Sequence, residues 1–170
     1  DTLLRAFDAA LPSLPHNMRL VVVGDGPDAA DFKALASSLG CASRIEFAGY
    51  QTGGALQAYV ERASLAIASS RWRENMPYSI VEAFAAGTPV IGTNIGGIPE
   101  LVDEGKTGFI CEPGDVQSMA DAISRGTSAF FDRSAYSMLQ RCCRSYVMEN
   151  CSREKFMSDL VNLYKESIDG

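Results

Sequence analysis

Short apolar runs alternate with helix-period segments along most of this chain. "MRLVVVGDGP" is a β-branched run that ends in a glycine-rich turn, and the segment after it, "DAADFKALASSLG", has apolar residues at helical spacing. The same order recurs in "RIEFAGY" and "GALQAYVERA", in "SLAIASS" and "PYSIVEAFAAG", and in "PVIGT". Strands that alternate with helices predict an α/β fold with a doubly wound, Rossmann-like parallel sheet, in which ligands bind at the carboxyl ends of the strands.

The C-terminal part of the chain is predicted to be helical, and residues 1–170 are predicted to form a single domain. The final segment, "REKFMSDLVNLYKESI", brings Phe156, Leu160, Tyr164 and Ile168 into one stripe. Core packing is a commoner reason for such a stripe than the binding of a partner helix. We therefore expect these side chains to be buried.

The chain is acidic, with a net charge of −6 and a pI near 4.8. This balance argues against a surface for nucleic acid or anionic membranes, so an anionic ligand needs a local feature to attract it. The five cysteines lack metal-ligand spacing, which favours reduced thiols in a cytoplasmic protein. With His16 as its single histidine, this chain cannot build a histidine-based triad or a multi-histidine metal site.

The first strand-to-helix turn, in "VVVGDGPDA", carries Gly24, Gly26 and Ala29 in a GxGxxA arrangement. This pattern is typical of a dinucleotide-binding turn, but two glycines in a tight turn also occur for geometry alone. Glu46 falls inside the next predicted strand instead of at its end, where an acidic residue would bind a ribose. The turn by itself leaves both interpretations open.

A second turn precedes the segment "PYSIVEAFAAG". Pro77 suits the first turn of a helix, and Met76 before it has no side-chain oxygen to cap the helix. The N–H groups of residues 78–80 are then free to bind an anion, helped by the helix dipole. Asn75 could supply a cap instead.

Two glutamates, Glu74 and Glu82, stand on either side of this helix start with seven residues between them. Their separation along the helix is too wide for a nucleophile and an acid/base group on one glycosidic bond. It suits two acceptors that bind different parts of one extended ligand. We expect Glu82 to be partly buried and to need partners, either ligand hydroxyls or a salt bridge in the core. Glu74 alone could equally be a solvated loop residue.

The stretch "SSRWRENMPYSIVEAFAAGTPVIGTNIGGIPELVDEGKTGFICEPGD" resembles the C-terminal, donor-binding domain of retaining glycosyltransferases of family 4, also called group 1. These enzymes use nucleotide sugars and have the GT-B fold. The motifs that match are the glutamate pair, "ENxP", "EAxAxGxPVI" and "GGxxE", preceded in the expected order by "VVGDGP" and "FAGY". The resemblance covers roughly residues 1–125.

The resemblance implies a role for each matching residue. Glu74 is the catalytic residue, facing the donor-sugar hydroxyls near the reacting carbon, and Glu82 accepts hydrogen bonds from the ribose. The other implied donor-binding residues are Asn75, Met76, Pro77, Tyr78 and Ser79 at the helix start, Gly24 and Gly26 beside the cleft, Tyr50 near the base, and Gly96 and Gly97, which bring backbone close to the site.

The implied activity is the transfer of a sugar, with retention, from a UDP- or GDP-linked donor to a glycan, lipid or small-molecule acceptor. No metal or other cofactor is expected. In the family, an N-terminal acceptor-binding domain and a first strand with a basic pair precede a stretch like "DTLLRAF". We expect these 170 residues to lack both and to be inactive alone, and the full-length protein to be cytoplasmic or peripheral at a membrane. A GT-B-type sugar-nucleotide epimerase, an NAD-dependent Rossmann enzyme and a non-catalytic binding module remain as alternatives.

Overall fold

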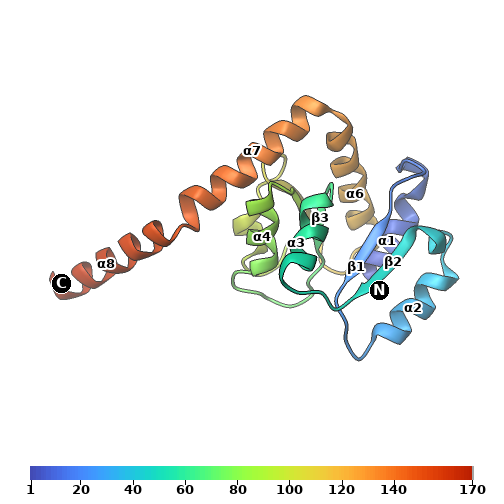
Figure 1. Ribbon diagram of the computed structural model, residues 1–170, viewed down its shortest axis with the longest axis horizontal. Coiled ribbons are helices and arrows are strands. Elements are labelled where there is room, and N and C mark those ends of the chain that lie inside the picture. The colour runs from blue at the N-terminus through green and yellow to red at the C-terminus, as the bar shows by residue number, and fades with distance from the viewer. Residues whose placement is uncertain (170) are drawn as a thin grey trace.

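The fold is taken from a computed structural model that describes residues 1–169 (Figure 1). The strands are β1 (Leu20–Val23), β2 (Ile45–Gly49), β3 (Ala66–Ala68), β4 (Val90–Thr93) and β5 (Gly108–Cys111). The helices are α1 (Thr2–Ala10), α2 (Ala29–Ser38), α3 (Gly53–Arg62), α4 (Tyr78–Ala86), α5 (Ile98–Leu101), α6 (Val116–Phe131), α7 (Arg133–Asn150) and α8 (Arg153–Asp169). Two short 3-10 helices cover Leu11–Ser13 and Ala42–Arg44. The predicted alternation of strands and helices is confirmed.

All strand pairs are parallel, as predicted, but the strands form two separate sheets. β1 pairs with β2, and β4 lies between β3 and β5. All four residues of β4 are buried, which explains the continuous apolar run in "PVIGT". Within residues 1–169, no ladder of hydrogen bonds joins β1 to β3.

One hydrophobic cluster spans both sheets and holds them together. Leu20 of β1 and Ile91 of β4 belong to this cluster, as do Leu4 and Phe7 of α1 and Met119 of α6. α1 and α6 also pack against each other. Burial of apolar surface, and not a continuous ladder, therefore joins the two halves of the fold.

A second cluster fixes the helix that follows the conspicuous loop at residues 69–77. Ile80 and Phe84 of α4 are almost completely buried against Ile98 and against Cys143 of α7. α4 ends at Ala86 and is followed by the capping residue Gly87, which adopts a left-handed conformation with φ of 79°. α4 is thus anchored along its inner face, and its first turn lies at the end of the loop that follows β3.

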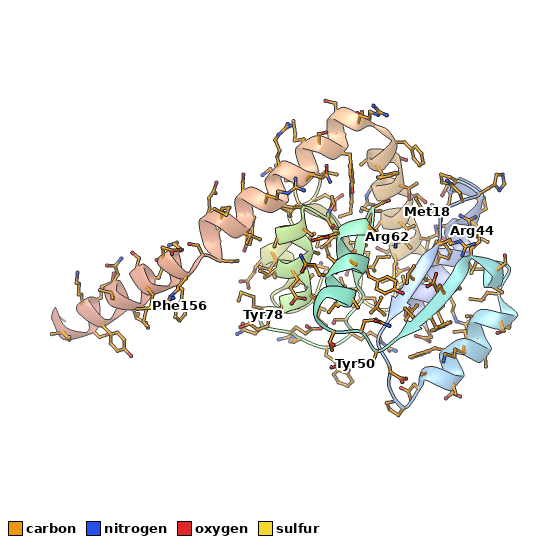
Figure 2. All side chains as sticks on the ribbon, in the orientation of Figure 1. Met18, Arg44, Tyr50, Arg62, Tyr78 and Phe156 are labelled. Carbon is orange, nitrogen blue, oxygen red and sulfur yellow. The ribbon has the colours of Figure 1, made fainter. Side chains whose placement is uncertain are left out.

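The expectation that the last helix packs into the core is wrong. α8 extends away from the body of the molecule beyond the end of α7 (Figure 1). Phe156 is 65% exposed on this helix (Figure 2). Tyr164 and Ile168 are 63% and 81% exposed, and Leu160 is half-buried. A helical stripe predicts an apolar face but does not identify the surface that covers it.

The cysteine side chains are free thiols in this fold. All five are unpaired, with Cys41, Cys111 and Cys143 buried. Burial raises the pKa of the Cys111 thiol to about 11 and that of Cys143 to about 12. In the described part of the chain, no helix combines the length and the hydropathy needed to cross a bilayer.

Candidate functional site

The turns that follow the parallel strands gather at one edge of the fold. The Gly24 N–H, just after β1, donates to the Gly49 carbonyl oxygen at the end of β2, at 2.8 Å. Tyr50 comes next and is 75% exposed, and Tyr78 at the start of α4 is 73% exposed (Figure 2). This edge is where an α/β sheet normally binds its ligand.

The first turn is not built like a pyrophosphate-binding turn. Gly24 has a φ of +134°, which side-chain-bearing residues rarely adopt, and a Cβ at Gly24 or Gly26 would meet no atom within 4 Å. The Gly26 N–H donates to the side-chain carboxylate of Asp25 at 2.8 Å. An anion at this turn would have to displace a carboxylate and approach its negative charge. The turn therefore has space for a ligand, but its Gly26 N–H is not free to bind an anion.

The start of α4 is uncapped by any side chain, as predicted. Pro77 occupies the cap position, with φ of −68° and ψ of 112°, and makes no side-chain hydrogen bond to the helix. The Asn75 side chain has no hydrogen-bond partner within residues 1–169, so the alternative cap is not formed. One detail of the prediction is wrong: the Ile80 N–H donates to the Pro77 carbonyl oxygen at 3.0 Å. Of the three N–H groups predicted to be free, those of Tyr78 and Ser79 have no protein acceptor within residues 1–169.

Glu74 is held by the protein and is not a solvated loop residue. It is half-buried, and its Oε1 accepts a hydrogen bond from the Ser70 hydroxyl. Its backbone carbonyl oxygen accepts from the Gly97 N–H at 2.7 Å. The Ser70 carbonyl oxygen in turn accepts from the hydroxyl of buried Thr93 at 2.8 Å. Sequence reasoning did not single out Ser70 or Thr93.

Gly96 and Gly97 bring the turn after β4 against the loop that carries Glu74. A Cβ at Gly96 would lie 2.5 Å from the Glu74 carbonyl oxygen, and φ at Gly96 is +61°. A Cβ at Gly97 would overlap the Asn75 carbonyl oxygen. The close backbone approach implied by the resemblance is therefore present, and its immediate partner is the backbone of Glu74 and Asn75.

Glu82 lies apart from this loop, on the outer side of α4. Together with Gly53, Leu56 and Val60 of α3, it lines a cavity of about 400 Å³ between the two helices. The expectation that Glu82 is partly buried is wrong, because the inner face of α4 is made by other residues and Glu82 is exposed. No ion pair to Glu82 forms within residues 1–169, so the alternative of a core salt bridge is also absent there.

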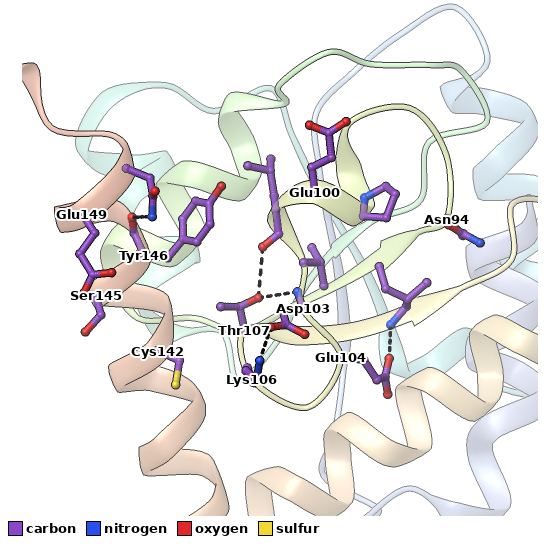
Figure 3. A pocket seen from close by; sticks show the side chains of 15 residues that line it. Asn94, Glu100, Asp103, Glu104, Lys106, Thr107, Cys142, Ser145, Tyr146 and Glu149 are labelled. Atoms are coloured by element: carbon purple, nitrogen blue, oxygen red, sulfur yellow. Dashed lines mark hydrogen bonds and ion pairs between the residues drawn. The ribbon is translucent and has the colours of Figure 1, made fainter. Parts of the chain in front are cut away.

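A larger groove of about 700 Å³ runs between the α5–β5 turn and α7 (Figure 3). Glu100, Asp103, Glu104 and Glu149 are among its lining residues, and the Lys106 ammonium is paired with Asp103 at 2.7 Å. Four carboxylates against one paired lysine disfavour a phosphate group. None of the residues predicted for the donor site lines this groove.

The chain is similar in sequence to known glycosyltransferases. It is 31% identical over 146 residues to N-acetyl-alpha-D-glucosaminyl L-malate synthase of Bacillus anthracis, a match that covers 86% of this chain and 37% of that protein. It is 35% identical over 133 residues to a GDP-mannose-dependent alpha-(1-6)-phosphatidylinositol monomannoside mannosyltransferase of Mycobacterium tuberculosis, covering 73% of this chain and 34% of that protein. The chain thus spans about a third of the length of these two relatives.

Solved structures share the fold. HepE of Anabaena, in complex with UDP, matches with a TM-score of 0.79 at 22% identity, covering 95% of this chain and 44% of that chain. This likeness confirms the predicted α/β fold with C-terminal helices, as found in GT-B glycosyltransferases. Residues 1–127 also match the family model described as Glycosyl transferases group 1. With most of its length inside that match, the chain belongs to the group 1 glycosyltransferases.

Proposed function

We propose that this chain provides the donor-binding part of a retaining glycosyltransferase that uses a UDP- or GDP-linked sugar. The observation that carries the proposal is the loop at residues 70–79. There, two N–H groups at the start of α4 lack protein acceptors, and the carboxylate of Glu74 is held a few residues before them. A donor of this class needs an anion site and hydroxyl acceptors close together.

Local electrostatics support an anionic ligand despite the overall acidity of the chain. The positive end of the α4 dipole and the free N–H groups of Tyr78 and Ser79 point to the same place. Arg71 and Arg73 are exposed on the loop before Glu74 and make no ion pair within residues 1–169. Together these groups can attract a diphosphate without a positive net charge.

The two glutamates then bind different parts of the donor. Glu82, in the cavity between α3 and α4, accepts hydrogen bonds from the ribose hydroxyls, with Tyr50 beside the base just ahead of α3. Glu74 accepts from hydroxyls of the sugar near the reacting carbon. The related structure holds UDP and one relative depends on GDP-mannose, which supports a nucleotide of either kind.

During transfer, negative charge builds up on the departing diphosphate. The free N–H groups at the start of α4 stabilise that charge, and they are already oriented before the reaction begins. The acceptor, a glycan, lipid or small molecule, approaches the sugar from a part of the protein outside this chain. No metal takes part in this proposal.

The two enzymatic alternatives are less well supported. A nicotinamide-dependent enzyme would use the turn at Gly24–Gly26, but there the Gly26 N–H is already occupied by Asp25. A sugar-nucleotide epimerase would share the architecture, but membership of the group 1 family favours transfer.

Titration of single-site variants of the full-length protein with UDP and GDP tests the proposal. We expect Glu82→Ala to weaken nucleotide binding by about 1.5–3 kcal/mol, the value of one hydrogen bond to a charged group. Glu74→Ala should keep the nucleotide affinity but abolish consumption of nucleotide sugar. Glu154→Ala, an exposed glutamate on α8, is the matched control and should change neither. Equal losses of nucleotide affinity in the Glu74 and Glu82 variants would contradict the assigned roles.

A further inference from the structure

We infer that Ser70 is a positioning residue for Glu74, and that Thr93 fixes Ser70 in turn. The inference rests on the proposed function, because it concerns how the catalytic carboxylate is oriented. It assigns a role to two residues outside the set that the resemblance implies. The two side chains form a chain of hydrogen bonds that begins in the buried strand β4 and ends on the Glu74 carboxylate.

The first link is the contact between Ser70 and Glu74. Both residues lie on the loop after β3 and are half-buried. The Ser70 hydroxyl donates to Glu74 Oε1 and has no other partner in the described part of the chain. By contrast, the hydroxyls of Ser37 and Ser38 in α2 donate to backbone carbonyl oxygens of their own helix, a common local role for serine.

The second link ties Ser70 to the sheet. The β3–β4 ladder ends with the pair Ala68 and Gly92, so backbone pairing no longer holds the chain beyond that point. Thr93 follows Gly92 and is completely buried. Its hydroxyl donates to the Ser70 carbonyl oxygen at 2.8 Å and lies 3.4 Å from the Ala68 carbonyl oxygen. The side chain of Thr93 thus extends the connection between the strands by two residues, as far as Ser70.

A third contact holds the backbone of Glu74. The Gly97 N–H donates to the Glu74 carbonyl oxygen at 2.7 Å, which fixes the backbone from which the side chain projects. Of the two carboxylate oxygens, Oε1 is bound by Ser70, whereas no group of residues 1–169 donates to Oε2. One oxygen is therefore committed to the protein, and the other can accept a donor-sugar hydroxyl.

This arrangement restricts the carboxylate before the donor binds. Such pre-orientation lowers the entropic cost of reaching the reactive geometry, and a misplacement of about 1 Å can reduce a rate by about 10²-fold. Loss of the Ser70 hydroxyl should consequently lower kcat while leaving the nucleotide subsite at Glu82 intact, because that subsite lies on other elements.

The test measures hydrolysis of UDP-glucose, UDP-N-acetylglucosamine and GDP-mannose by the full-length protein, together with affinity for UDP and GDP. We expect Ser70→Ala to lower kcat on the accepted donor about 10- to 100-fold, with nucleotide Kd within about twofold of wild type. Ser70→Thr keeps the hydroxyl and should restore most of the activity. Ser69→Ala is the matched control, since the neighbouring Ser69 hydroxyl makes no hydrogen bond within residues 1–169.

The same variants distinguish a positioning role from a structural one. Thr93→Val removes the buried donor at constant size and should lower kcat in the same direction as Ser70→Ala. Wild-type kcat in Ser70→Ala overturns the inference, and so does a parallel loss of kcat, nucleotide affinity and melting temperature. If Ser70→Ala does not fold, Ser70→Cys, which donates only weakly, replaces it and should show the same loss of kcat. A wild-type protein that binds neither UDP nor GDP and consumes none of the donors overturns the proposed function itself.

Discussion

Replacing Gly96 by alanine should damage the loop that carries Glu74 through two separable effects. The left-handed backbone at Gly96, with φ of +61°, is unfavourable for alanine. The new methyl group would also lie 2.5 Å from the Glu74 carbonyl oxygen and 2.8 Å from the Glu74 nitrogen. Both contacts are with backbone, which cannot rotate away as a side-chain end can.

The size of each effect follows from general values. A left-handed alanine costs about 1 kcal/mol, and forcing extra atoms into a packed site costs about 1–3 kcal/mol. We therefore expect Gly96→Ala to lower the free energy of unfolding by about 2–4 kcal/mol. Gly114→Ala is the matched control, because Gly114 has a φ of +78° but no atom within 4 Å of its Cβ position. It should lose only the first contribution, about 1 kcal/mol.

Urea unfolding, followed by far-UV circular dichroism, gives the free energy for each variant. The loop that carries Glu74 can also move and relieve part of the contact with the new methyl group. In that case the fold loses less stability, but Glu74 is displaced and hydrolysis of nucleotide sugar by the full-length protein falls. Gly96→Ala should therefore differ from Gly114→Ala in stability, in activity or in both. Identical stability and identical activity in the two variants would refute the close packing of the β4–α5 turn on the Glu74 loop.

Two further outcomes are expected. Nucleotide binding should not depend on magnesium, because the proposed anion site consists of N–H groups at a helix start. Calorimetry with magnesium and with a chelator should give the same Kd for the nucleotide. A strict need for Mg²⁺ would contradict the proposed anion site. Stability should fall as the pH rises from about 9 towards about 11, because the fold keeps the Cys111 thiol neutral while the unfolded chain ionises first. In Cys111→Ala the urea midpoint should decline less steeply between about pH 9 and about pH 11, and an unchanged slope would exclude this thiol as the cause.

Features that depend on nearby residues could be predicted from the sequence. The buried strand in "PVIGT" and the uncapped start of α4 after Pro77 follow from local composition, and both are present. The closeness of Gly96 and Gly97 to Glu74 could be expected only through the family resemblance, because the two segments are some twenty residues apart. That contact is made by backbone atoms, which leave no pattern of their own in a sequence.

Other features depend on what lies across space, and these were missed. The side of α4 that faces the core is set by its neighbours, and they leave Glu82 exposed. The division of the strands into two sheets depends on pairing between distant segments. The Ser70–Glu74 contact was missed because a hydrogen bond between loop residues has no periodic signature.

The packing of α1 against α6 has a consequence for biosynthesis. α1 ends at Ala10 and α6 begins at Val116, so roughly a hundred residues must be translated between them. At a translation rate of about 5–20 residues per second, α6 is synthesised about 5–20 s after Leu4 and Phe7. During that time these two side chains lack the helix that helps to bury them. During that interval the nascent chain presents an apolar helix face of the kind that chaperones bind. The early residues of this chain therefore complete their fold late, after the strands of both sheets have been translated.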